Sequence, residues 1–94
     1  MNNESLRIRL VRALSVDRYE WLVTYHGWAE TPIHPENVEG QGYNEVGFET
    51  ELDRFDHLYG AQSYARDWAV GSGFKAGPLK PALGDTLEIR LRRP

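Results

Sequence analysis

The sequence contains no cysteine, which excludes disulfide bonds, thiolate metal sites and cysteine nucleophiles together. Long apolar runs are also missing, since no window approaches the roughly 18 residues that a membrane-spanning helix requires. The opening stretch Met-Asn-Asn-Glu-Ser lacks the basic segment and apolar run of a secretion signal. We therefore expect a soluble, cytoplasmic protein that makes no membrane contact.

Patterns of catalytic or metal-binding residues are equally scarce. The three histidines, His26, His34 and His57, are not spaced so that two or three would converge on a zinc ion. Ser72 follows a predicted helix rather than a strand, so it lacks the context of a nucleophile elbow. The glycines of residues 71–77 also follow that helix, whose C-terminal end repels phosphate. The sequence predicts no enzyme, no metal and no cofactor.

The length and composition indicate one ordered domain over residues 1–94. A chain of 94 residues is too short for a second hydrophobic core. The hydrophobic fraction of 40% includes three Trp, five Tyr and three Phe, whose large buried areas favour an ordered domain over a disordered tail. No internal repeat is visible, and no motif assigns the chain to a family.

Alternating apolar and polar residues predict four strands. They cover Leu6–Leu10, Tyr19–Trp28, Val46–Leu52 and Leu87–Leu91. The third also fits the first turn of a helix, and we prefer the strand.

A helical repeat of apolar residues predicts one helix over Arg54–Ala69. Asp53 is the preferred N-cap and Thr50 the rival, while Gly71 and Gly73 end the helix. Residues 29–43 and 74–84 are rich in Pro and Gly, and we interpret both segments as loops. Since long irregular loops are often functional, residues 29–43 are the first candidate contact surface.

These elements predict an α+β fold, β-β-β-α-β, with a four-stranded, mostly antiparallel sheet in the order 3-2-1-4 and the helix on one face. The last strand docks beside the first, parallel to it, through a right-handed crossover. The helix is expected to cover the face that carries Leu6, Ile8, Leu10, Trp21, Val23, Tyr25, Phe48, Leu87, Ile89 and Leu91. The opposite face is then polar, acidic at one edge and basic at the other, and no aromatic residue is expected on it.

Charge is unevenly distributed along the chain. Residues 30–56 carry eight acidic residues against Arg54 alone, a net charge of −7, whereas residues 1–29 carry +1 and residues 57–94 carry +3. The favoured hypothesis is a non-enzymatic protein-binding module that acts through this acidic surface. One version is a phage-encoded inhibitor of a nucleic-acid-handling or defence complex (anti-CRISPR-like). The predicted partner-binding residues are Glu30, Glu36, Glu39, Tyr43, Glu45, Glu49, Glu51, Asp53 and Asp56.

Two alternatives remain open. Arginines along the strands predict a nucleic-acid-binding surface, because guanidinium groups contact the phosphate backbone. That surface consists of Arg7, Arg9, Arg12, Arg90, Arg92 and Arg93. The other alternative is a structural or self-assembling protein that uses an open strand edge.

Overall fold

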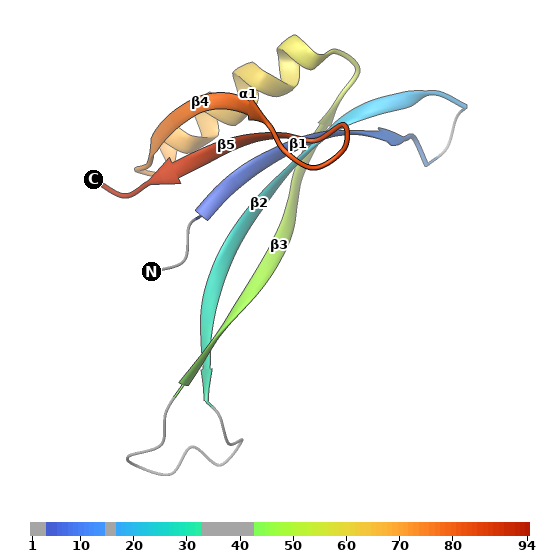
Figure 1. Cartoon of the computed structure of the whole chain (residues 1–94). Coiled ribbons are helices and arrows are strands. Elements are labelled where there is room, and N and C mark those ends of the chain that lie inside the picture. Colours follow the sequence, from blue (N-terminus) through green and yellow to red (C-terminus); the bar gives the residue numbers. More distant parts are fainter. Residues whose placement is uncertain (1–3, 15–16, 33–42) are drawn as a thin grey trace.

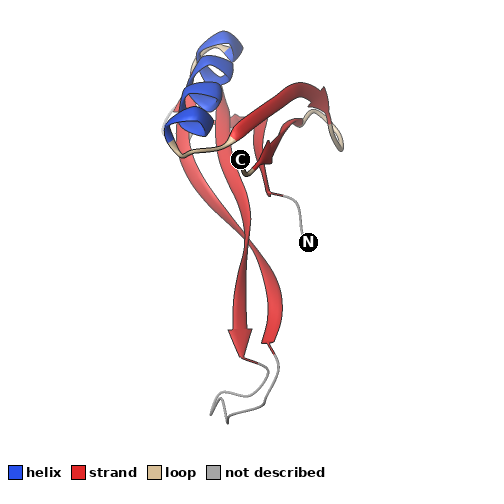
Figure 2. Ribbon diagram, turned by 90° about the vertical axis from the view of Figure 1, so that its left-hand side faces the viewer, coloured by secondary structure: helices blue, strands red, loops and turns tan. Residues whose placement is uncertain are grey.

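The computed structural model describes residues 4–14, 17–32 and 43–94. Its elements follow in the order β-β-β-α-β-β: β1 (Glu4–Arg12), β2 (Tyr19–Pro32), β3 (Tyr43–Phe55), α1 (Leu58–Gly71), β4 (Lys75–Pro81) and β5 (Leu87–Arg92). The strands form one sheet in the order β3-β2-β1-β5-β4, and the four neighbouring pairs are antiparallel. Helix α1 packs on one face of it (Figure 1; Figure 2). The predicted α+β class, with one helix and an antiparallel sheet, is confirmed.

The predicted number and order of strands are wrong, because part of the expected loop 74–84 forms β4. Its prolines are tolerated there, since an edge strand can lack backbone donors without losing ladder bonds. Pro78 falls in an irregularity of the pairing between Ala76 and Leu79. The additional strand reverses the chain once more, so β5 runs antiparallel to β1 and not parallel to it.

The helix begins at Leu58 rather than Arg54, with His57 and not Asp53 at the N-cap position. Residues 46–52 are part of a strand, and that strand continues to Phe55, which pairs with Trp21 of β2. Local capping signals in this region are overridden because pairing with β2 satisfies the backbone. At the other end, Gly73 has φ = +84°, so it provides the predicted left-handed termination.

The core lies between α1 and the central strands. Alanines at 61, 65 and 69 are fully buried, and their small side chains let the helix approach the sheet closely. The residues of this core are Leu6, Ile8, Val23, Ala61, Ala65, Ala69, Ile89 and Leu91. The prediction fails for Leu10 and Phe48, which are 43% and 42% exposed. Leu10 lies toward the end of β1, and Phe48 is paired with Gly27 of β2, beyond the residues of β2 that pair with β1. Tyr59 of α1 is 81% exposed, so it does not belong to the core.

The β2–β3 hairpin extends well beyond the rest of the sheet (Figure 1). The described part of β1 pairs with β2 only as far as His26, whereas β2 and β3 remain paired to Pro32 and Tyr43. We call residues 27–32 and 43–48 the arm. The expected loop 29–43 is therefore shorter, with strand at both ends, and its remainder lies outside the described residues.

Candidate functional site

Charged side chains segregate across the face of the sheet opposite α1, which we call the open face. Strand pairing places on it Arg7 and Arg9 of β1, the even-numbered residues of β2 and their partners on β3 and β5. The β3 side carries three acidic residues, Glu45, Glu49 and Glu51, and one basic residue, Arg54. The β4–β5 side carries one acidic residue, Glu88, and four basic residues: Lys75, Lys80, Arg90 and Arg92. The expected acidic and basic edges are both present.

The basic side is hollowed into a pocket of about 520 Å³, which we call the β4–β5 cleft. Its lining comprises Lys75, Ala76, Gly77, Pro78, Lys80, Pro81, Glu88, Arg90 and Arg92. Glu88 is shared between Arg7, at 3.3 Å, and Arg90, at 3.8 Å. Within the described part of the chain, the other three cations, from Lys75, Lys80 and Arg92, have no carboxylate within ion-pair distance. Their positive charge is therefore available to an anion entering the cleft.

Only part of the predicted arginine surface lies on one face of the sheet. Arg7, Arg9, Arg90 and Arg92 lie on the open face, whereas Arg12 and Arg93 belong to the other side of the sheet. Arg12 pairs with Asp17. Sequence reasoning missed the two lysines of the cleft, because it assigned residues 74–84 to a loop. The alternation of Lys75 with Ala76, and of Leu79 with Lys80, was the available signal.

Arg93, which follows β5, links the C-terminal end of the chain to β1. Its Nη2 donates to Glu4 at 2.8 Å, and its guanidinium lies over the ring of Phe74 at 5.1 Å. Glu4 also accepts a hydrogen bond of 2.9 Å from the hydroxyl of Tyr25. Burial raises the pKa of Tyr25, and the bond to Glu4 adds to this rise. This cluster has a structural role on the helix side of the sheet.

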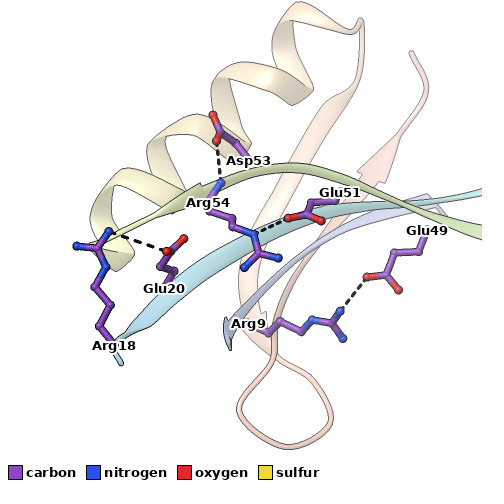
Figure 3. Close-up of polar contacts among 7 residues, drawn as sticks. All are labelled: Arg9, Arg18, Glu20, Glu49, Glu51, Asp53 and Arg54. Atoms are coloured by element: carbon purple, nitrogen blue, oxygen red, sulfur yellow. Dashed lines mark hydrogen bonds and ion pairs between the residues drawn. The ribbon is translucent and has the colours of Figure 1, made fainter. Parts of the chain in front are cut away.

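The predicted acidic surface is partly neutralised within the chain (Figure 3). Glu49 pairs with Arg9 at 3.3 Å, and Glu51 with the Nε of Arg54 at 2.6 Å. Asp53 points to the helix side and accepts the backbone N–H of Arg54 at 2.8 Å.

The remaining predicted acidic residues lie apart from this group. Asp56 is 3.5 Å from Arg18. Glu30 is opposite Glu45 in the arm, and Tyr43 is the first residue of β3. Glu36 and Glu39 lie outside the described residues. Among the described residues, Asp53 and Asp56 therefore lie apart from the acidic residues of the open face, and the role of the predicted acidic residues in partner binding stays a prediction.

An aromatic residue does lie on the open face, contrary to expectation. Trp28 is 45% exposed, and the longer β2 places it on the same side as Thr24 and His26. The even numbering of these residues was a usable signal, but Trp28 was assigned to the end of its strand. A Cβ added to Gly47 would lie 3.2 Å from Cζ3 of the indole, so the ring rests across this glycine.

A second pocket, of about 360 Å³, borders Trp28. It is lined by Ser5, Arg7, His26, Gly27, Trp28, Gly47, Phe48 and Glu49. Burial lowers the pKa of His26, and the nearby Arg7 contributes to this effect, so the imidazole is predominantly neutral at pH 7. A neutral imidazole offers one hydrogen-bond donor and one acceptor.

The described residues contain no group of three or more His, Asp or Glu side chains arranged to hold a metal ion. In the same residues, no helix has the length and apolar character needed to cross a membrane. Comparisons with protein-family models, curated proteins and solved structures match none of them to this chain.

Proposed function

We propose that this chain is a non-enzymatic nucleic-acid-binding module that uses the open face of its sheet. The observation that carries the proposal is the β4–β5 cleft, which is lined by Arg90 and by three cations that have no carboxylate partner among the described residues. Phosphate groups match this surface in charge, and their contacts with Lys and Arg provide most of the non-specific affinity for nucleic acids. The overall charge of −3 does not oppose this, since Glu45, Glu49 and Glu51 lie on the β3 side of the open face. Glu88, the carboxylate in the cleft lining, is paired with Arg7 and Arg90.

Salt dependence provides the test. We expect a fluorescently labelled oligonucleotide to bind with an affinity that falls as NaCl is raised from 50 to 300 mM. Each phosphate contact contributes about −0.7 to the slope of log K against log salt for a single strand. Arg92→Gln and Lys80→Gln should each weaken binding and flatten this slope by about 0.7.

Arg66→Gln is the matched control, because Arg66 is exposed on α1 and has the same type of charge. It should leave both the affinity and the slope unchanged. The proposal is refuted if the wild-type chain does not bind at 50 mM NaCl, or if Arg66→Gln weakens binding as much as Arg92→Gln.

A second candidate function is the protein-binding module that acts through an acidic surface, including its version as an inhibitor of a nucleic-acid-handling complex. The observation that favours it is that β3 is an edge strand carrying Glu45, Glu49, Glu51 and Asp53. An open edge can accept a strand from a partner, and the carboxylates would select a basic one. A protein captured from nuclease-treated bacterial lysate should be lost on Glu45→Lys and Asp53→Lys. Retention by this double variant would contradict the hypothesis.

A further inference from the structure

The indole of Trp28 lies half-exposed on the open face, on the arm of the β2–β3 hairpin. It lies two residues beyond His26, where the described part of β1 no longer pairs with β2. The ring is held against the arm because its cross-strand partner is Gly47, whose missing side chain leaves room for it. The same hairpin uses the reverse arrangement on its other face, where Phe48 covers Gly27. An aromatic ring packed across a cross-strand glycine covers the backbone of the strand at that position.

This indole is also in reach of the basic side of the open face. Ser5 is opposite both His26 of β2 and Arg90 of β5, so the three residues form one row across the sheet. The row spans two strand spacings, about 10 Å, and Trp28 lies two residues, about 7 Å, further along β2. The two pockets therefore lie on one continuous face, with the cations of the cleft at one end and Trp28 at the other.

The residues between the two ends suit a phosphate backbone. Arg7 lines the second pocket and interacts with Glu88, while Ser5 and His26 add neutral polar groups. The carboxylate that borders the pocket, Glu49, is balanced by Arg9 at 3.3 Å and approached by His26 at 3.7 Å. A chain of phosphates leading from the cleft would therefore meet little uncompensated negative charge before it reaches the indole.

We propose that the open face binds single-stranded nucleic acid, with phosphates in the β4–β5 cleft and an unpaired base stacked on Trp28. This inference rests on the proposed function and specifies its ligand. Bases of a duplex are stacked on one another and do not offer their faces to a side chain, whereas every base of a single strand does. Since stacking on an aromatic ring needs no particular base, we expect little sequence preference.

The test compares labelled dT15, rU15 and a 15-base-pair DNA duplex by fluorescence anisotropy. Trp28→Ala should weaken binding of either single strand by about 5-fold to 100-fold and leave duplex binding within about 2-fold. Trp28→Phe should retain part of the affinity, because a smaller ring still stacks. The slope against salt should stay unchanged in both variants, since no phosphate contact is removed.

Val46→Ala is the matched control. Val46 is exposed to a similar extent, 48%, but lies on the other face of the arm, so single-strand affinity should stay at the wild-type level. Circular dichroism of each variant checks that the fold is intact. Equal losses for single strands and duplex on Trp28→Ala, or no loss for single strands, would overturn the inference and leave the proposed function standing. Failure of the wild-type chain to bind any of the three probes would instead reject the proposed function.

Discussion

Gly27 makes possible a sharp test of how the arm is packed. A Cβ built on this glycine would lie 2.7 Å from Cε2 of Tyr25 and 2.8 Å from Cζ of Phe48, closer than side-chain contacts allow. Tyr25 cannot easily move away, because its hydroxyl donates to Glu4 and its ring packs against Trp68 at 5.2 Å. Gly27→Ala must therefore displace one of the two rings.

The expected magnitude follows from two opposing effects. Overpacking at a filled site reduces the free energy of unfolding by about 1–3 kcal/mol. Replacing a strand glycine by alanine restores about 0.5–1 kcal/mol by restricting the unfolded chain. We expect a net loss of about 1 kcal/mol for Gly27→Ala, within a range of about 0–2.5 kcal/mol, measured from urea unfolding followed by circular dichroism.

Two other glycines serve as matched controls. At Gly47 the added Cβ would meet only the indole of Trp28, at 3.2 Å, and this ring is half-exposed and can shift, so Gly47→Ala should change stability little. At Gly71, the last helical residue, nothing lies within 4 Å, so Gly71→Ala should be neutral or stabilising by up to about 1 kcal/mol. The reasoning is refuted if Gly27→Ala is as stable as Gly47→Ala.

Three further predictions concern the sheet and its ion pairs. Ile8→Ala should lower the free energy of unfolding by about 2–5 kcal/mol, since this side chain is fully buried; a smaller loss in urea unfolding would contradict the core described above. Arg9→Ala should change it by less than about 1 kcal/mol, because its ion pair with Glu49 is exposed, and a larger loss would show a stronger coupling. Because the folded state lowers the pKa of His26, it binds fewer protons there than the unfolded chain, so stability is complete above about pH 6.5 and declines below it. The urea concentration at the unfolding midpoint should therefore decrease when the pH is lowered from 7.5 to 5.5, and it should decrease less in His26→Asn. An equal decrease in both proteins would refute the lowered pKa of His26.

Regular alternation predicted the central part of the fold well, because burial on one face imposes it directly. Leu6, Ile8 and Ile89 are fully buried as expected, and β1, β2 and β3 form the predicted meander. The edges were predicted poorly. In β4, Pro78 and the irregular pairing around it interrupt the alternation, and only the neighbouring strand β5 makes the segment a strand.

The candidate site was harder to predict than the core, because it depends on which charged side chains form ion pairs in the folded chain. The sequence contains the clusters of Arg and Glu but not their pairing, and pairing across the sheet joins Arg9 to Glu49, forty residues apart. The acidic run of residues 30–56 is the largest concentration of charge in the sequence, yet in the structure Glu49 and Glu51 form ion pairs with Arg9 and Arg54. The lysines of the cleft stand apart in the sequence, and antiparallel pairing of β4 with β5 brings them beside Arg90 and Arg92.

The two ends of the open face have different consequences for binding. In the proposed complex, contacts in the β4–β5 cleft would be with phosphates, which carry no sequence information, and these contacts would weaken as salt is added. Stacking on Trp28 is insensitive to salt but requires an unpaired base. A ligand that uses both ends must be anionic and locally unpaired, so the structural state of the nucleic acid, rather than its sequence, is what this face would select.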